Sequence, residues 1–341
     1  MAEGKSSKGW IAAIVAVALV IIAGAAFLLR GGEDGDVLRV ANQRGSTKSM
    51  MIASGALEGA PYRVEWSEFP AAQHLLEALG SGSVDLGLAG DAPFIFAYQS
   101  GSPIKAVGAH AQEARQPGAL AILVPKDSPI RSVRDLIGKR ISTTRGSVGH
   151  HLILEALERE KLAADDVVIV FLPPGDAKAA FDRGSIDAWA MWSPYTIVAL
   201  KEGARIIADG SAFGPSAGFE IAHIDSIEPK RALIEDFLKR EAKALQWAQA
   251  NPDAYAKVLS EETGLPIDIA KEVVVRNRRV AVPIDETIIR HEQEIADRFQ
   301  RAGILQIKRP LSEAFDPGLT AALFSSTETN AEVEAPAAAG E

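Results

Sequence analysis

The sequence predicts an α/β protein built from two similar lobes, and two patterns carry this prediction. Short β-rich runs alternate with helical patterns through most of the chain, an order typical of α/β proteins with largely parallel sheets. One strand–helix–strand unit is also written twice in the sequence. Of the 341 residues, 47% are hydrophobic and 24% are charged, so the chain can bury the cores of two such lobes.

Residues 1–30 are predicted to be an export signal or a membrane anchor. Uncharged, mostly apolar residues fill positions 10–29 and follow a leader that contains Lys5 and Lys8. A span of about 20 residues can cross a bilayer, whereas the apolar part of a cleaved signal is usually about 7–15 residues long. Small residues at 23–25 offer a cleavage site, but the apolar run continues beyond them. We therefore favour an uncleaved anchor.

The two ends of the remaining chain are predicted to be unstructured. Residues 31–36 are glycine and acidic residues, which is typical of a flexible linker. Residues 325–341 contain four glutamates, no basic residue and no periodicity, which is typical of a disordered tail. The folded body therefore spans residues 37–324, a length that suits two lobes.

Ten strands are predicted within this body, and the region after them is predicted to be helical. The predicted strands cover residues 37–41, 62–68, 84–89, 104–110, 119–124, 140–144, 167–172, 188–192, 205–208 and 218–223. Beyond residue 229 the apolar residues recur every three or four positions, which indicates amphipathic helices. These helices are predicted over residues 234–250, 252–263, 267–277 and 285–302.

The repeated unit consists of a strand, a proline, a helix, a Gly-Ser turn with an aspartate, and a second strand. Pro70 and Asp85 mark the first copy and are 15 residues apart, while Pro173 and Asp187 mark the second and are 14 apart. Two copies so far apart indicate two similar lobes that face each other, because a repeat array would have more copies at a shorter period.

Composition and motifs argue against an enzyme, a metal site and a nucleic-acid-binding protein. The chain has no cysteine, which removes thiol nucleophiles and disulfides, and its formal charge of −9 disfavours phosphate-backbone contacts. It contains no H-E-x-x-H, Walker A or complete G-x-G-x-x-G sequence. Residues 214–218 match G-x-S-x-G, but a strand-like run follows where that motif requires a helix. We therefore predict no catalytic residue, no metal ligand and no cofactor.

The candidate site consists of three loops that follow predicted strands and open helices. Helix N-termini present free backbone N–H groups and a positive dipole end, and ligands of α/β proteins bind beyond the carboxyl ends of the strands. Trp189 and Trp192 lie next to the same edge in the second copy of the repeat. The predicted ligand-binding residues are Gln43, Arg44, Thr47, Asp91, Ala92, Gly146, Ser147, His150, Trp189 and Trp192.

Over about residues 37–316 the sequence resembles the substrate-binding proteins of ABC transporters in the aliphatic sulfonate, taurine and nitrate group. The resemblance is strongest to the aliphatic sulfonate-binding branch and rests on an ordered set of short segments. These segments are residues 65–70, 82–85, 90–93, 121–125, 146–150, 172–174, 187–189, 192–194, 276–282 and 284–285, with Gln293, Ala296, Asp297 and Phe299.

This resemblance implies the type II periplasmic binding protein fold, with two lobes, two hinge crossings and C-terminal helices packed on the first lobe. We place the crossings near residues 124–126 and 212–219. The first lobe then comprises residues 37–124 and 217–324, and the second comprises residues 125–216. The ligand implied is a small organic anion, an aliphatic sulfonate in first place, which the protein delivers in the periplasm to an ABC permease and its ATPase in a pathway of sulfur metabolism.

Three alternatives remain open from the sequence. Taurine, nitrate or a pyrimidine-like nutrient could replace the aliphatic sulfonate, because Gly90-Asp91-Ala92-Pro93 stands where relatives commonly have a Glu-Thr-Pro type sequence and Gly149 precedes His150. A desulfinase-like enzyme on the same fold is disfavoured by the lack of cysteine. A membrane-tethered sensor or scaffold would use the two lobes without transport.

Overall fold

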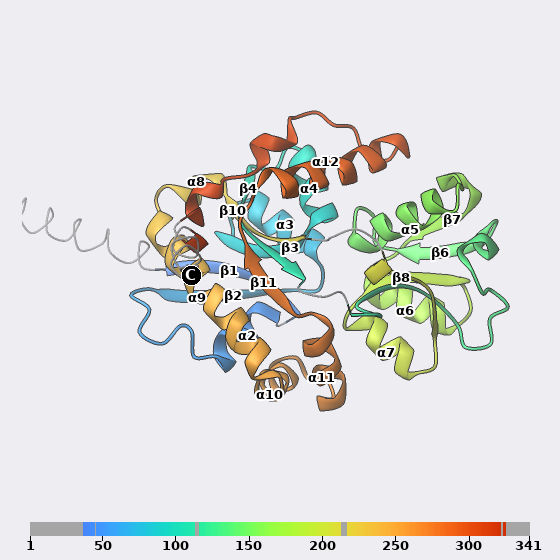
Figure 1. Ribbon diagram of the computed structural model, residues 1–341, viewed down its shortest axis with the longest axis horizontal. Coiled ribbons are helices and arrows are strands. Elements are labelled where there is room, and N and C mark those ends of the chain that lie inside the picture. Colours follow the sequence, from blue (N-terminus) through green and yellow to red (C-terminus); the bar gives the residue numbers. More distant parts are fainter. Residues whose placement is uncertain (1–36, 45, 113–115, 213–216, 322, 325–341) are drawn as a thin grey trace, which may run out of the picture.

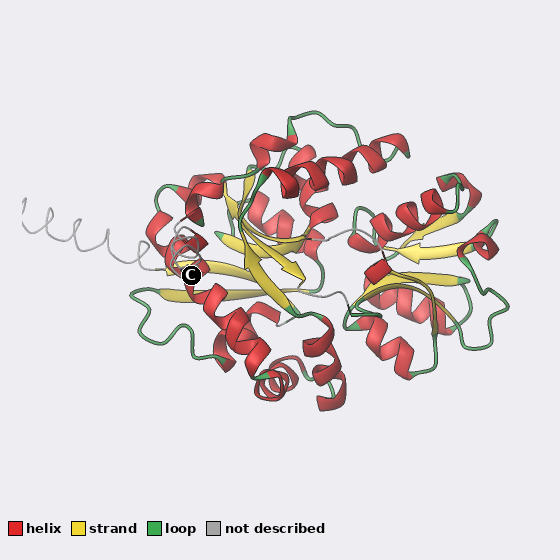
Figure 2. Ribbon diagram, viewed as in Figure 1, coloured by secondary structure: helices red, strands yellow, loops and turns green. Residues whose placement is uncertain are grey.

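The structure, a computed structural model, describes residues 37–44, 46–112, 116–212, 217–321 and 323–324. These residues form two lobes side by side, each built around one mixed β-sheet (Figure 1). Helices flank each of the two sheets, which is the α/β arrangement that the sequence predicts (Figure 2). The predicted anchor at 10–29, the linker and the tail at 325–341 lie outside the described residues.

The sheet of the first lobe has six strands in the order β11-β4-β10-β3-β1-β2. Strand β1 pairs in parallel with β2 and β3, whereas β10 runs antiparallel between β3 and β4. A return strand from late in the sequence therefore lies in the middle of this sheet. The strands are β1 (Val37–Gln43), β2 (Arg63–Phe69), β3 (Leu86–Gly90), β4 (Ile104–Gln112), β10 (Ala217–His223) and β11 (Arg279–Val282).

The sheet of the second lobe has five strands in the order β7-β6-β8-β5-β9. Strand β6 pairs in parallel with β7 and β8, while β5 runs antiparallel to β8 and β9. The strands are β5 (Leu120–Val124), β6 (Arg140–Thr143), β7 (Val168–Phe171), β8 (Ala188–Trp192) and β9 (Arg205–Asp209).

The position of β5 corrects the lobe boundary expected from the sequence. We expected residues 37–124 to belong to the first lobe, but β5 hydrogen-bonds to β8 and β9 in the second sheet. The chain thus crosses to the second lobe between Gln112 and Leu120, before β5 rather than after it. Strand β5 fits the pattern of a buried strand in either lobe, and only its long-range pairing decides which sheet it joins.

Ten of the eleven described strands coincide with runs predicted from the sequence, and only β11 was not predicted. Strand β11 is four residues long and falls between two amphipathic helices, so its alternation is too short to stand out in the sequence. Nevertheless it extends the first sheet by pairing with β4, and its first residue, Arg279, lies opposite Gln112.

The C-terminal helices pack on the first lobe, as the resemblance implies. Helix α9 contacts β11 and α2, α10 contacts α2, and α12 contacts α4. The phenol of Tyr255 in α10 donates a hydrogen bond to the Ser46 carbonyl at 3.0 Å. The helices are α2 (Ser46–Ala53), α3 (Ala72–Gly80), α4 (Asp91–Gln99), α5 (Val148–Arg159), α6 (Pro174–Asp182), α7 (Tyr195–Lys201), α8 (Ile224–Ile227), α9 (Arg231–Ala250), α10 (Pro252–Thr263), α11 (Ile267–Arg276) and α12 (Glu286–Arg301).

The repeated sequence unit occupies the same place in both sheets. Asp85 accepts a hydrogen bond from the Arg39 backbone N–H, and Asp187 accepts one from the Arg140 backbone N–H, each at 2.8 Å. Asp85 thereby connects the turn before β3 to the neighbouring strand β1. Asp187 connects the turn before β8 to the neighbouring strand β6 in the same way. The prediction of two similar lobes is confirmed by this match.

Among the described residues, none of the helices combines the length and the hydropathy needed to cross a bilayer.

Candidate functional site

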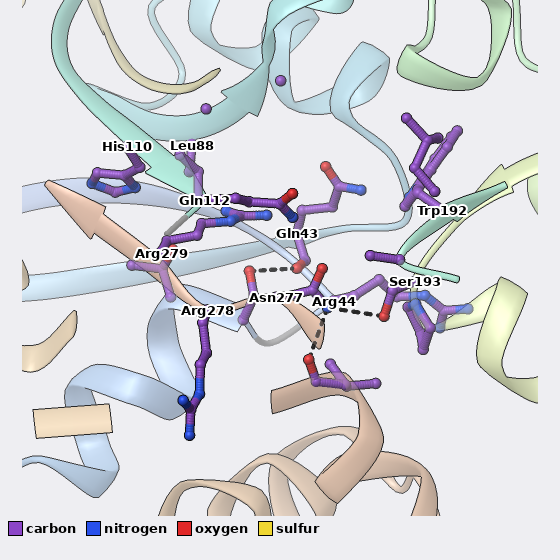
Figure 3. A pocket seen from close by; sticks show the side chains of 18 of the residues that line it. Gln43, Arg44, Leu88, His110, Gln112, Trp192, Ser193, Asn277, Arg278 and Arg279 are labelled. Carbon is purple, nitrogen blue, oxygen red and sulfur yellow. Dashed lines mark hydrogen bonds between the residues drawn. The ribbon is translucent and has the colours of Figure 1, made fainter. Parts of the chain in front are cut away.

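The candidate site is a cleft between the lobes with a volume of about 240 Å³. Strand ends and loops of the first lobe form one wall, and the end of β8, the start of α5 and residues after β9 form the other (Figure 3). The second-lobe wall includes Trp192, Ser193 and Pro194, and Trp192 supplies its aromatic surface. This position beyond the strand ends is where α/β folds bind ligands.

Arg279 provides an uncommitted positive charge in the cleft. Its guanidinium makes no hydrogen bond or ion pair with any described residue, although it is only partly exposed. Burial lowers the pKa of Arg279, while the nearby Tyr255, Glu241 and Glu220 act in the opposite direction, so the group stays charged. A partly desolvated guanidinium that makes no direct hydrogen bond or ion pair is suited to bind an anion, although Glu241 and Glu220 lie near enough to act on its charge.

Two uncharged amides lie beside this guanidinium. Gln112 is the cross-strand partner of Arg279, so the two side chains share one face of the sheet. Figure 3 shows the Arg279 side chain extending toward Gln112 and Gln43, while Arg278 points away from them. The side-chain amides of Gln43 and Gln112 make no hydrogen bond to a described residue and are free to donate to a ligand.

Hydrogen bonds of Arg44 and Asn277 are among those that join the lobes at the edge of the cleft. Arg44, which has a positive φ of 54°, donates from Nη2 to the Tyr195 hydroxyl at 2.7 Å and from Nε at 3.1 Å. Its guanidinium also lies 5.0 Å from the centre of the Tyr195 ring. Asn277 donates from Nδ2 to Ser193 Oγ at 2.9 Å. The Arg44 guanidinium is thus tied to the other lobe by hydrogen bonds to a neutral hydroxyl.

Five of the ten predicted residues line the cleft, namely Gln43, Arg44, Thr47, Ser147 and Trp192. The structure brings them together from the end of β1, α2, the start of α5 and β8, which supports the argument that the ends of several strands meet there. Their contact with a ligand stays a prediction. The other five, Asp91, Ala92, Gly146, His150 and Trp189, are not among the lining residues.

The loop before α5 uses its polar groups internally. Ser147 caps the helix by accepting from the His150 N–H at 3.2 Å, and the Gly146 N–H donates to His150 Nδ1 at 3.1 Å. His150 is fully buried, and its ring contacts those of Phe171 and Phe299 at 4.9 and 5.2 Å. Burial lowers the pKa of His150 to about 4, so the ring is neutral at pH 7. These contacts support a structural role for His150.

Asp91, Ala92 and Trp189 are also buried. Trp189 lies in the core of the second lobe, 5.7 Å from the Phe181 ring. Asp91 accepts from the Ala92 N–H at 2.6 Å, and it lies near Glu292, whose carboxyl pKa is raised well above its usual range by burial and by the charge of Asp91. Asp91, which we expected to contact the ligand, therefore lies toward α12 and is not among the residues that line the cleft.

A buried polar cluster forms the floor of the cleft on the first lobe, and it consists of His110, Glu220 and Glu241. His110 and Glu241 line the cleft, and His110 Nε2 lies 3.3 Å from Glu241 Oε2. Burial raises the pKa of Glu220 well above its usual range and that of Glu241 to about 7, and it lowers that of His110 to about 4. Sequence analysis did not select these residues, because they are far apart in the chain and match no motif.

Comparison with known proteins gives a family and a function class. Residues 64–255 match the family model described as NMT1/THI5 like. A putative aliphatic sulfonates-binding protein of Escherichia coli strain K12 is 35% identical over 269 residues, which cover 77% of this chain and 83% of the relative. One of Bacillus subtilis strain 168 is 29% identical over 315 residues, covering 87% and 94% of the two chains.

Solved structures agree with these sequence matches. The alkanesulfonate-binding protein SsuA of Xanthomonas axonopodis pv. citri, bound to MOPS, superposes with a TM-score of 0.76 at 31% identity and covers 82% of this chain and 98% of its own. The desulfurization enzyme DSZB has the same fold, with a TM-score of 0.66 and 16% identity, and covers 86% of this chain and 99% of its own. The fold alone therefore does not separate binding proteins from enzymes.

Proposed function

Since this chain belongs to the NMT1/THI5-like family and groups there with aliphatic sulfonate-binding proteins, we propose that it is the substrate-binding protein of an ABC transporter. It captures a small aliphatic sulfonate in the cleft between its lobes and delivers it to a membrane permease that an ATPase drives. The periplasmic binding proteins among its relatives support a location outside the cytoplasm.

The observation that carries this proposal is the free guanidinium of Arg279 in the cleft. A sulfonate has one negative charge spread over three oxygens, and it needs a cation together with several neutral donors. Arg279 supplies the charge, and the amides of Gln43 and Gln112 supply uncharged N–H donors next to it. Trp192 offers an apolar surface for the carbon chain.

Binding is coupled to closure of the lobes. The contacts from Arg44 to Tyr195 and from Asn277 to Ser193 exist only when the two walls of the cleft are close. A ligand that touches both walls stabilises this closed state, because it binds more tightly there than to either lobe alone. The permease can then distinguish the loaded protein from the empty one by its shape.

We further propose that the protein binds its ligand without chemical conversion. The chain has no cysteine for a thiol nucleophile. In addition, His150 at the start of α5 is packed between aromatic rings and is not among the residues that line the cleft. Incubation with a sulfinate or sulfonate, followed by mass spectrometry, should return the ligand unchanged; release of sulfite would contradict the proposal.

We also propose that residues 10–29 hold the mature protein at the membrane. The length of this uncharged run supports the proposal. N-terminal sequencing of the mature protein, together with carbonate washing of membranes, tests it. A mature N-terminus beyond residue 25 and a protein found in the soluble fraction would contradict a tether and indicate a cleaved signal.

The ligand itself is tested by calorimetry with the full chain. The titrants are methanesulfonate, butanesulfonate, taurine, nitrate, a pyrimidine and, as a shape-matched control, pentanoate. We expect an alkanesulfonate to bind most tightly and pentanoate to bind at least tenfold more weakly. The proposal fails if no sulfonate binds, or if nitrate or the pyrimidine is preferred.

A further inference from the structure

The polar cluster on the floor of the cleft is built by three separate elements of the first lobe. His110 comes from β4, Glu220 from the adjacent β10 and Glu241 from α9. Gly218 lies opposite His110 in the ladder, and side chains two residues apart along a strand share a face, so His110 and Glu220 project from the same side of the sheet. Helix α9 brings Glu241 to that side.

The donor atoms of the cluster converge and are poorly satisfied by the protein. One imidazole nitrogen and one oxygen from each carboxylate all lie within 4.8 Å of one another. The three side chains are 4%, 1% and 1% exposed for His110, Glu220 and Glu241. Within the described part of the chain, none of the four carboxylate oxygens has a hydrogen-bond partner. Buried carboxylates normally have partners, so this arrangement calls either for a proton shared by the two carboxyls or for a cation between them.

We propose that His110, Glu220 and Glu241 form a binding site for one divalent transition-metal ion of the Zn²⁺ type. One imidazole and two carboxylates are a common ligand set for such ions, and three protein ligands leave one position open. At metal–ligand bonds of about 2.0 Å, neighbouring ligand atoms of a tetrahedral site are about 3.3 Å apart. The 3.3 Å between His110 Nε2 and Glu241 Oε2 matches that edge, and a carboxylate oxygen of Glu220 lies within 4.8 Å of the ligand atoms of both.

The site has a route for the ion and a consequence for the cleft. His110 and Glu241 line the cleft, so the ion can enter from there and its open position faces the same space. Glu241, whose pKa is raised to about 7, is partly ionised at neutral pH and repels an anion near Arg279, and a bound dication neutralises that charge. This effect on the ligand rests on the proposed sulfonate function, whereas the metal site itself does not.

Metal binding is tested with the full chain, stripped by a chelator and titrated with Zn²⁺ alone. We expect one Zn²⁺ per chain and a higher melting temperature when the ion is bound. Glu220→Gln and Glu241→Gln should each weaken Zn²⁺ binding at least tenfold. Glu292→Gln is the matched control, because Glu292 is an equally buried carboxyl on α12 outside the cluster, and it should bind Zn²⁺ like the unchanged protein.

Two outcomes overturn the proposal. Zn²⁺ binding of equal strength in the unchanged protein and both cluster variants would assign the ion to surface histidines. An unchanged melting temperature would mean that the two carboxyls share a proton instead. If a cluster variant fails to fold, Co²⁺ added to the unchanged protein decides: the visible absorption of four- or five-coordinate Co²⁺ is expected, and its absence contradicts the site. Since Zn²⁺ alone is used, failure here is independent of sulfonate binding.

Discussion

Arg44 of the first lobe donates two hydrogen bonds to the hydroxyl of Tyr195 in the second, across the edge of the ligand cleft. The two residues are 151 positions apart in sequence, and the guanidinium also lies over the phenol ring. This contact is available only while the lobes are closed. It therefore contributes to the free energy of closure, which is coupled to ligand binding.

Removal of the Tyr195 hydroxyl should weaken ligand binding without harming either lobe. Tyr195→Phe keeps the ring under the guanidinium but removes the acceptor, and we expect a loss of about 1 kcal/mol, roughly a fivefold weaker affinity. Calorimetry with the preferred sulfonate measures it. Tyr62→Phe is the matched control, because its hydroxyl bonds to Asp236 within the first lobe, and it should leave the affinity unchanged. Equal affinity of Tyr195→Phe and the unchanged protein would show that the contact does not contribute to closure.

Gly149 in α5 should be intolerant of a side chain. A Cβ atom there would lie 2.6 Å from Thr143 Oγ1 and 2.7 Å from the Ala190 carbonyl oxygen, both closer than van der Waals contact allows. Because the carbonyl belongs to the central strand β8, it cannot move aside easily, and we expect Gly149→Ala to cost about 1–3 kcal/mol of unfolding free energy.

Chemical denaturation of Gly149→Ala and of the control Gly175→Ala tests this expectation. Gly175 lies in α6, and no atom lies within 4 Å of the position that a Cβ would take there, so the control should be neutral or slightly more stable. Two variants of equal stability would contradict the close packing of α5 on β8.

Asp85 should matter more for stability than its repeat counterpart Asp187. Asp85 is fully buried and accepts hydrogen bonds from Arg39, Lys230 and Ser226, whereas the Asp187 side chain is 36% exposed. Replacing Asp85 by Asn leaves two cations without their counter-charge, at a cost of about 3–5 kcal/mol. Asp187→Asn should cost about 1 kcal/mol or less. The midpoints of urea unfolding compare the two variants, and equal losses would contradict the difference in burial.

The Asp85 carboxyl also makes the stability of the folded protein depend on pH. Burial by itself raises the pKa of Asp85, but the hydrogen bonds from Arg39 and Lys230 outweigh it and hold the pKa at about 2. The unfolded chain, with an Asp pKa of about 3.9, binds the proton more readily. The stabilisation is therefore present above about pH 4 and is lost as the pH falls toward 2. Asp85→Asn should flatten this part of the stability curve, and an unchanged slope would contradict the depressed pKa.

The sequence predicts the architecture well because the relevant signals are local. The Gly-Ser turns with Asp85 and Asp187 identify the repeat, and the strand patterns identify ten of the eleven described strands. The lobe to which β5 belongs could not be predicted, since a buried apolar strand fits either sheet and only its pairing with β8 and β9 decides.

Only part of the candidate site could be predicted from the sequence, because some of its residues come together only when distant strands pair. The loops after β1 and before α5 carry Gly and Ser signatures that point to helix N-termini, and they lead to Gln43, Arg44, Thr47 and Ser147. Arg279 and Gln112 come instead from two strands that pair only in the folded protein. The run Arg276-Asn277-Arg278-Arg279 stands out in the sequence, but nothing local shows that Arg279 faces Gln112 while Arg278 points away.

The affinity of Arg279→Gln for an alkanesulfonate tests the central claim most directly. Arg279 is the uncommitted guanidinium beside Gln43 and Gln112, so its loss should weaken binding by about 1.5–3 kcal/mol, a factor of about ten to more than a hundred. Arg278→Gln is the matched control: Arg278 also lines the cleft, but its side chain points away from Gln43 and Gln112, so this variant should bind within about twofold of the unchanged protein. An unchanged affinity of Arg279→Gln, or a larger loss in Arg278→Gln, would contradict the assignment of the sulfonate to this cleft.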